Sequence, residues 1–262
     1  MLDLSIILPT CNRASLLLTS LMHIERSTSC SFEVIVVDGA SQDATPEVLE
    51  LARSIMGSRL RVIRESKREG FVKATNKGFR AARGRYMTWL NDDARPTRSS
   101  LDFAVEQLES SASRTTQNVG LVAMYHAWHS TRNVAFTKTL DEKTFSLCHV
   151  RGTLYANFCV GLRATFERLG YFDERFYCQG ADPDLSLKAW HAGFTVVPAH
   201  ASFIDHDEHH DARREQDQPA MSDDNKRLFA KWDLPAKSNV NDFNPERPCT
   251  LRGLLDYQNQ AA

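Results

Sequence analysis

Two adjacent aspartates, Asp92 and Asp93, end an apolar run that begins at Tyr86. A buried strand that ends in acidic residues places negative charge at the carboxyl edge of a sheet, where open α/β folds bind their ligands. Carboxylates at such an edge suit a hard divalent cation that holds phosphate groups. An isolated pair of this kind is more often a turn or a helix cap, so the rest of the chain must decide its role.

Three more polar clusters lie at the ends of predicted elements, at residues 9–13, 38–43 and 182–184. The first two, together with the acid pair, follow the first, second and fourth strands of the predicted sheet. Because the carboxyl ends of parallel strands meet at one edge, we expect these clusters to converge on one crevice.

Alternating strands and helices supply these ends. Short apolar runs rich in β-formers predict strands at 4–8, 32–37, 60–63 and from 86 onward. Helical spacing predicts helices at 12–24, 41–55 (capped by Thr45), 74–82 and from Ser99 or Ser100 to Leu108. This alternation is typical of a parallel sheet covered by helices. Met87, Trp89, Phe103 and Leu108 have the spacing of core residues.

The pattern is less regular beyond residue 115. We expect a strand at 119–125, strands or loops outside the main sheet at 126–150, and a polar loop at 205–221. Further helices are predicted at 164–169, 182–192 and 223–232, and short strands at 194–197 and 202–204.

The composition is that of an ordinary globular protein, with 262 residues, 42% hydrophobic and 25% charged. A net charge of −1 gives no basic field for binding nucleic acid. The six cysteines form no C-x-x-C pair, which favours reduced thiols in a cytoplasmic protein. No run approaches 18 apolar residues, so we expect no signal peptide and no spanning helix, while peripheral membrane contact stays open.

Seven segments together resemble the family-2 glycosyltransferases, which are inverting enzymes of the GT-A fold. They lie in the family's order between about residues 4 and 232, at 5–13, 33–43, 70–78, 82–86, 90–93, 169–176 and 182–188. Each is weak alone, but seven in order are a specific signal. The resemblance implies an α/β GT-A domain over residues 1–235, with a nucleotide-binding half at 1–115, an acceptor half at 116–235 and a C-terminal arm at 236–262.

The resemblance implies a set of residues that bind the nucleotide-sugar donor. Arg13 would be the cation of the first loop, and Asp38 would accept a hydrogen bond from the imide N–H of the base, which favours UDP or dTDP. Lys73 and Asn76 would line the nucleotide pocket, and Asp92 would face the ribose or the donor sugar. The full set is Pro9, Thr10, Asn12, Arg13, Asp38, Lys73, Asn76, Asn91 and Asp92.

Asp93 matches the last acid of the family's D-x-D motif. The resemblance therefore implies that Asp93 binds Mn²⁺ or Mg²⁺, which stabilises the departing nucleoside diphosphate. Asn91 occupies the first motif position, where a neutral amide presents less charge to the metal. Family members often carry a histidine near the metal, and His206 fits that position best. Its rivals are His200, His209 and His210.

Asp182 matches the family's catalytic base, which takes a proton from the acceptor hydroxyl as that hydroxyl attacks the anomeric carbon. Ala181 stands where the family usually has Glu, a departure that bears on acceptor choice or on catalysis. Four residues lie where the family shapes the acceptor side, although a core role fits them equally well. They are Tyr155, Asn157, Phe158 and Trp190.

These features predict transfer of a sugar to a hydroxyl of a saccharide, glycolipid, protein or small molecule. The departures at Asn91 and Ala181 keep open a non-catalytic nucleotide-sugar or glycan-binding protein with the same fold. A nucleotidyltransferase requires a Gly-rich loop after the first strand, and a dinucleotide dehydrogenase requires G-x-G-x-x-G there. Residues 9–13 provide neither.

Overall fold

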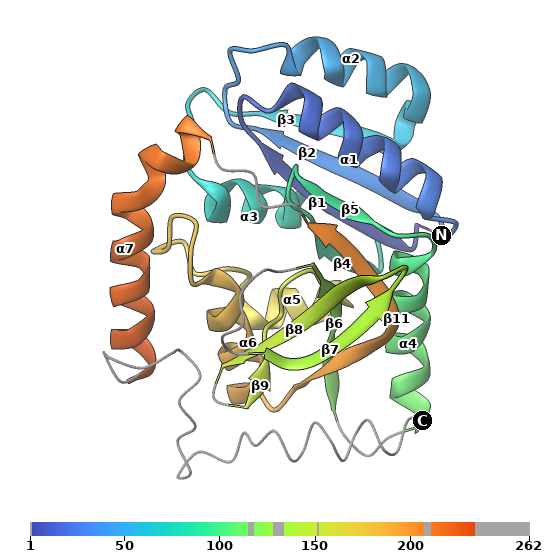
Figure 1. The fold of residues 1–262 in the computed structure, drawn as a ribbon, viewed down its shortest axis with the longest axis vertical. Coiled ribbons are helices and arrows are strands. Elements are labelled where there is room, and N and C mark those ends of the chain that lie inside the picture. The colour runs from blue at the N-terminus through green and yellow to red at the C-terminus, as the bar shows by residue number, and fades with distance from the viewer. Residues whose placement is uncertain (1, 115–117, 128–133, 151, 207–210, 234–262) are drawn as a thin grey trace.

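The computed structural model describes residues 2–114, 118–127, 134–150, 152–206 and 211–233. Within them one sheet of eleven strands runs through the molecule, with the order β3-β2-β1-β4-β10-β6-β11-β5 along its main path (Figure 1). The first four strands are parallel to one another: β1 (Leu4–Thr10), β2 (Phe32–Asp38), β3 (Leu60–Arg64) and β4 (Tyr86–Trp89). Every residue of β1, β2 and β4 is buried, as expected for parallel strands covered on both faces.

Successive residues of β1 pack into two different cores, because side chains alternate across a strand. Leu4, Ile6 and Leu8 pack on one face with α1 (Ala14–Ser27), α2 (Thr45–Met56) and α4 (Ser100–Arg114). Ile7 packs on the other face with α3 (Phe71–Ala81), α5 (Arg163–Leu169) and α6 (Ala181–His191). A short 3-10 helix, η1 (Gly57–Arg59), precedes β3.

The second half of the chain extends the same sheet. β6 (Val119–His126) lies beside β10 (Cys159–Leu162), which pairs antiparallel to both β4 and β6. A hairpin of β7 (Val134–Leu140) and β8 (Lys143–Val150) branches from β6 and also pairs with β9 (Thr153–Leu154). Strands or loops outside the main sheet were expected at residues 126–150; the described part forms strands, but they branch from β6 as part of the same sheet.

One long strand, β11 (Thr195–His206), replaces the two short strands predicted at 194–197 and 202–204. Its first part pairs parallel to β6, and its last part pairs antiparallel to β5 (Ala94–Pro96). The register with β6 shifts between Pro198 and Phe203; beyond the shift Phe203 and Ile204 pair with β6 again, while Ile204 to His206 pair with β5 along the other edge of the strand. Since β5 directly follows the acid pair, the pairing sets His206 opposite Ala94, one residue after Asp93.

The expectation of a polar loop at 205–221 is wrong for the residues that the structure describes: 205 and 206 end β11, and a helix begins at 212. Helix α7 (Ala212–Trp232) begins directly after Asp211, whose side chain accepts from the backbone N–H of Arg214 and caps it. The segment before residue 223 carries few apolar side chains and contains Pro219, so no apolar periodicity marked it as helical. Figure 1 shows α7 along one side of the molecule, from the level of α3 to that of α6.

Several element boundaries also differ from those predicted. α1 begins at Ala14 because Asn12 has a positive φ of 53° and Arg13 is not helical. The N-cap of α2 is Ala44, and Thr45 is the first helical residue, whose backbone N–H and hydroxyl donate to Asp43, so Thr45 is not the cap. Phe103 is 41% exposed and is not a core residue, whereas Met87, Trp89 and Leu108 are buried as predicted.

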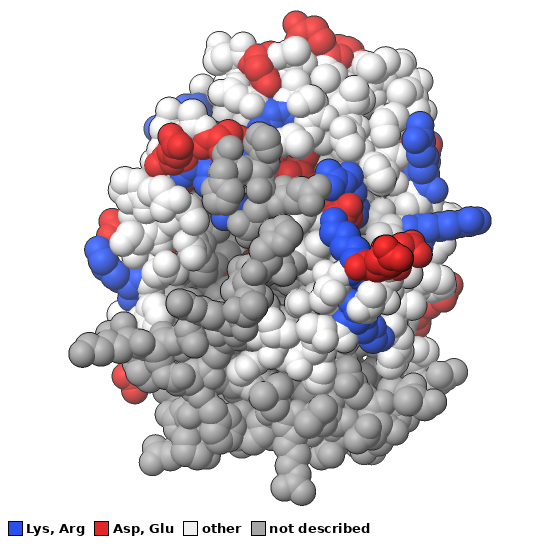
Figure 2. All heavy atoms as spheres, in the orientation of Figure 1, with Lys and Arg blue, Asp and Glu red and all other residues white. Residues whose placement is uncertain are grey.

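Figure 2 shows one face of the molecule, on which the acidic and basic side chains drawn in colour are interspersed. Such mixing agrees with the net charge of −1. In the part of the chain that the structure describes, no helix combines the length and the apolar character needed to cross a membrane. Five cysteines lie in that part, and all five are free thiols: Cys11, Cys30, Cys148, Cys159 and Cys178.

Candidate active site

A cleft of about 400 Å³ opens at the carboxyl ends of β1 and β4, between them and α7. The parallel register sets Thr10 beside Asp38 and Ile7 beside Trp89, so the segments that follow these strands start at a common edge. The predicted site residues that line this cleft are Pro9, Thr10, Arg13, Asn91, Asp92, Asp93, Asp182 and His206. The structure therefore brings together the residues predicted to bind a metal, the first loop and the predicted base.

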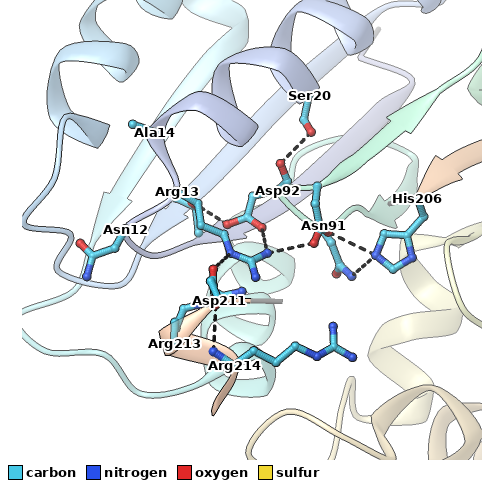
Figure 3. Close-up of polar contacts among 12 residues, drawn as sticks. Asn12, Arg13, Ala14, Ser20, Asn91, Asp92, His206, Asp211, Arg213 and Arg214 are labelled. Carbon is cyan, nitrogen blue, oxygen red and sulfur yellow. Dashed lines mark hydrogen bonds and ion pairs between the residues drawn. The ribbon is translucent and has the colours of Figure 1, made fainter. Parts of the chain in front are cut away.

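Arg13 lies at the centre of a buried network of charges (Figure 3). Its Nη1 donates to Asp92 Oδ1 at 3.0 Å and to Asp93 Oδ2 at 2.9 Å, and its Nε donates to Asp211 Oδ2 at 2.7 Å. All but Asp211 are at least nine-tenths buried. The guanidinium thus compensates both acids of the pair and ties them to the first turn of α7.

The two acids of the pair make different contacts. Asp92 is committed to the protein, because Arg13 donates to its Oδ1 and the hydroxyl of Thr10 donates to its Oδ2 at 2.9 Å. Burial raises the pKa of Asp92, while Arg13 opposes that rise. Asp93 instead turns Oδ1 toward His206, whose Nε2 lies 3.2 Å away. Asn91 Nδ2 also lies 3.3 Å from this ring nitrogen.

Asp93 and His206 fit a divalent cation that is completed by its substrate. Among the described residues, no three His, Cys, Asp or Glu side chains gather as a metal site. Two protein ligands are nevertheless enough for a cation whose remaining positions are taken by phosphate oxygens and water. An imidazole ligand suits Mn²⁺ better than Mg²⁺, which prefers oxygen. His200 lies outside the cleft lining, and His209 and His210 fall outside the described residues.

Asp182 lies in the first turn of α6, and its side chain faces the cleft. Its Oδ1 is buried and has no hydrogen-bond partner among the described residues. Burial raises the pKa of Asp182 to about 7, and nearby His206 limits the rise. A carboxylate with a pKa near neutrality is suited to general-base catalysis, because it is ionised and still basic at physiological pH.

Asp38 and Asn12 are not among the residues that line the cleft. Asp38 is buried; its Oδ1 accepts from the backbone N–H of Ser41 at 3.0 Å, and its Oδ2 lies 3.6 Å from Arg64 Nε. Asn12 connects two loops, since its Oδ1 accepts from the N–H of Gln42 and its own N–H donates to the hydroxyl of Ser41. We therefore assign Asn12 to loop geometry and not to donor contact.

Lys73 and Asn76 do not line the cleft, so the positions predicted for them are not supported. Asn76 is fully buried, and its amide donates to the carbonyl of Phe172 and accepts from the Phe172 N–H, at 2.9 and 3.0 Å. Both bonds hold the segment after α5 against α3. The helical spacing of 74–82 gave no indication of which face would be turned toward the nucleotide.

Sequence reasoning missed the basic residues that α7 and the segment after β3 contribute. Arg68 and Arg213 both line the cleft, and Arg68 pairs with Asp217 of α7. Arg213 lies 4.0 Å from Asp211, and its Nε is buried without a hydrogen-bond partner among the described residues. The available signal was the run from Asp211 to Arg214, which begins with a helix-capping residue.

Two of the four residues predicted to shape the acceptor side line the cleft. Tyr155 and Asn157 line it, whereas Phe158 is buried and Trp190 packs against the ring of His191. Ala181 is 2% exposed, so the position of the missing acid lies in the core beside the base.

The family model described as "Glycosyl transferase family 2" matches residues 5–166, more than half of the chain. The PGL/p-HBAD biosynthesis glycosyltransferase of Mycobacterium bovis BCG is 36% identical over 89 residues, which are 34% of this chain and 34% of that protein. The match thus spans about a third of that relative's length.

Solved structures resemble the whole described fold. The mannosyltransferase PcManGT from Pyrobaculum calidifontis, in complex with GDP-Man and Mn²⁺, has a TM-score of 0.66 at 20% identity, over 98% of this chain and 70% of its own. S. aureus TarS 1–349 in complex with UDP has a TM-score of 0.60 at 18% identity, over 87% of this chain and 72% of its own. At such identities the likeness is one of fold.

Proposed function

Because the chain belongs to glycosyl transferase family 2 and has the GT-A fold that its sequence predicts, we propose that it transfers a sugar from a nucleoside-diphosphate donor to an acceptor hydroxyl. The proposed reaction inverts the anomeric carbon by direct displacement. One observation supports the proposal most strongly: the acid pair with Arg13 and the carboxylate of Asp182 line the same cleft. The raised pKa of Asp182 suits a general base.

The donor end of the cleft is built from the first loop, Asp93 and the basic residues of α7. We propose that Asp93 and His206 hold Mn²⁺, which would supply charge stabilisation for the departing diphosphate. Arg213 also lines the cleft, and its guanidinium would be a further cation for the phosphate groups. The diphosphate of PcManGT's GDP-Man and of TarS's UDP is the kind of ligand that this end fits.

The base of the nucleotide is proposed to be a pyrimidine, so UDP or dTDP is the favoured carrier. Asp38 directly precedes Gly39, which lines the cleft; one of its carboxylate oxygens accepts from Ser41, and the other makes no hydrogen bond among the described residues, although Arg64 Nε lies 3.6 Å from it. A single acceptor matches the single imide N–H of uracil or thymine, whereas guanine presents two neighbouring donors.

Asp182 is proposed to take the proton of the acceptor hydroxyl. The carboxylate is desolvated, so it gains more from accepting a proton than it would in water. Its place in the first turn of α6 favours the ionised form that must be present before attack. The acceptor oxygen then attacks the anomeric carbon on the face opposite the diphosphate, and the bond to the diphosphate breaks.

A panel of nucleotide sugars tests this function. UDP, dTDP and GDP sugars are each added with Mn²⁺, and thermal stabilisation and release of nucleoside diphosphate are recorded. A bound donor raises the melting temperature by mass action. Asp182→Asn should lower the rate of release to a small residual value while the stabilisation persists, and the control Asp223→Asn, at an exposed acid of α7, should leave both unchanged.

The panel also separates the two candidate functions. Stabilisation without release by the wild type would favour the non-catalytic binding protein. Release by Asp182→Asn at a rate near that of the wild type would show that the base has been assigned wrongly.

A further inference from the structure

One carboxylate of α7 holds the backbone of the segment that leads to the proposed base. Asp224 is 1% exposed, and its two oxygens accept from the backbone N–H groups of Tyr177, Cys178 and Gln179 at 2.8 to 3.0 Å. Arg227, one turn along α7, donates to Asp224 Oδ1 at 3.0 Å. Three successive amides converging on one carboxylate fix the path of this segment closely, because each bond to a charged acceptor is short and directional.

The segment held by Asp224 ends where α6 begins. Gly180 follows with a φ of 78°, which few other residues tolerate, and its carbonyl accepts from the N–H of Asp184 in the first turn of the helix. Asp182 lies two residues beyond Gly180. Any shift of residues 177–179 therefore moves the start of α6 and the carboxylate of Asp182 with it.

The same segment is held from the opposite side by α3. The N–H of Val72 donates to the carbonyl of Tyr177 at 3.1 Å, and a Cβ added at Gly70 would lie 2.6 Å from the Tyr177 ring. The path of the backbone is therefore defined between two helices, and Asp224 is the side chain that holds its N–H groups.

We infer that Asp224 is a positioning residue for the base: it sets where Asp182 stands in the cleft without itself touching a substrate. The inference rests on the proposed function of Asp182. Catalysis by a base depends on placement to within about 1 Å, and a misplacement of that size costs on the order of a hundredfold in rate. If α7 only packed against α6, its contacts would not need to include one buried carboxylate that accepts from three successive backbone N–H groups.

The variants that test this role change the carboxylate and leave the rest of α7 intact. Asp224→Asn removes the charge and replaces one acceptor oxygen by a donor that faces the amides. Asp224→Glu retains the charge and both oxygens but is longer by one methylene, so it keeps the fold and displaces the segment. The matched control is Asp223→Asn, the adjacent exposed acid that pairs only with Lys226 among the described side chains.

The assay measures release of nucleoside diphosphate from UDP-glucose, UDP-N-acetylglucosamine and GDP-mannose in the presence of Mn²⁺, with water as the acceptor hydroxyl. Rates are divided by the number of UDP or GDP binding sites from calorimetry, so that unfolded molecules do not count. We expect kcat per site to fall roughly 10- to 100-fold for Asp224→Asn and about 10-fold for Asp224→Glu. The KM for the donor should stay within about twofold, and Asp223→Asn should match the wild type.

The Asp182→Asn background separates positioning from loss of structure. If Asp224 acts through Asp182, Asp224→Asn should change the residual rate of Asp182→Asn by less than about twofold. The inference is overturned if kcat per site matches that of Asp223→Asn, or if Asp224→Asn lowers the rate by the same factor in both backgrounds. Failure of the proposed function looks different: the wild type then releases no nucleotide, or Asp182→Asn is as fast as the wild type.

Discussion

Replacement of Arg13 by Met is expected to lower the free energy of unfolding by about 3–5 kcal/mol. The residue is 6% exposed, and its guanidinium donates to the carboxylates of Asp92, Asp93 and Asp211. Met fills much of the same volume, so the loss comes from charge and not from a cavity. Removing one partner of a buried ion pair costs about 3–5 kcal/mol, because the charges left behind stay buried without compensation.

The loss at Arg13 is expected to depend on pH. Burial already raises the pKa of Asp92, and Arg13 is the largest influence that lowers it. Without the guanidinium the pKa in the folded state rises further above the unfolded value, which is about 3.9. A carboxyl group with a raised folded pKa favours folding at low pH, and this contribution is lost as pH rises through the folded pKa. The variant should therefore lose more stability at pH 8 than at pH 5.

Urea unfolding followed by circular dichroism at both pH values measures the effect. Thermal unfolding gives a second measure: for a fold of this size, 1 kcal/mol corresponds to about 2–4 °C in Tm, so the Tm should fall by roughly 6–20 °C. Arg53→Met is the control: this guanidinium is exposed and pairs with Glu50 on the surface of α2, so its loss should cost less than about 1 kcal/mol. A loss at Arg13 below about 1 kcal/mol, or the same loss at both pH values, would refute the reasoning.

Two other predictions follow from the site. Burial raises the pKa of Asp182 to about 7, so with Asp182 as the proposed base kcat should rise about tenfold per pH unit below 7 and level off above it; a profile flat from pH 5 to 9 would contradict this. Asn76→Ala should lower the free energy of unfolding by about 2–3 kcal/mol, because two backbone groups of Phe172 lose their partner, while calorimetry with UDP shows unchanged affinity. Weaker UDP binding without a loss of stability would instead restore Asn76 to the nucleotide pocket.

The donor end of the cleft could be predicted from the sequence because its residues follow buried strands. The apolar runs of β1, β2 and β4 are unambiguous, and parallel pairing brings their ends together whatever the loops contain. Thr10, Arg13, Asp92 and Asp93 could therefore be assigned to one edge before any contact was known.

The rest depended on partners far away in the sequence. The first part of α7 is held by two ion pairs, Asp211 with Arg13 and Asp217 with Arg68. Neither pair can be recognised from the sequence around α7 alone, because the arginines lie far away in the chain. Asn76 faces Phe172, 96 residues later, so its helical position alone could not distinguish a structural amide from a ligand. Local patterns report burial and propensity, whereas the direction of a polar side chain is decided by tertiary packing.

The bond between Arg13 and Asp211 joins residues 198 positions apart in the chain, and this separation has a consequence for biosynthesis. At 5–20 residues per second, a ribosome needs roughly 10–40 s to synthesise the chain between them. During that time β1, β2 and β4 are all available to pair, but neither the third carboxylate around Arg13 nor Asp224 has been made. The nascent protein therefore carries Arg13 and the acid pair before α7 has been made, so a chain stalled on the ribosome at that point holds these residues without Asp211, which pairs with Arg13, and without Asp224, which holds residues 177–179.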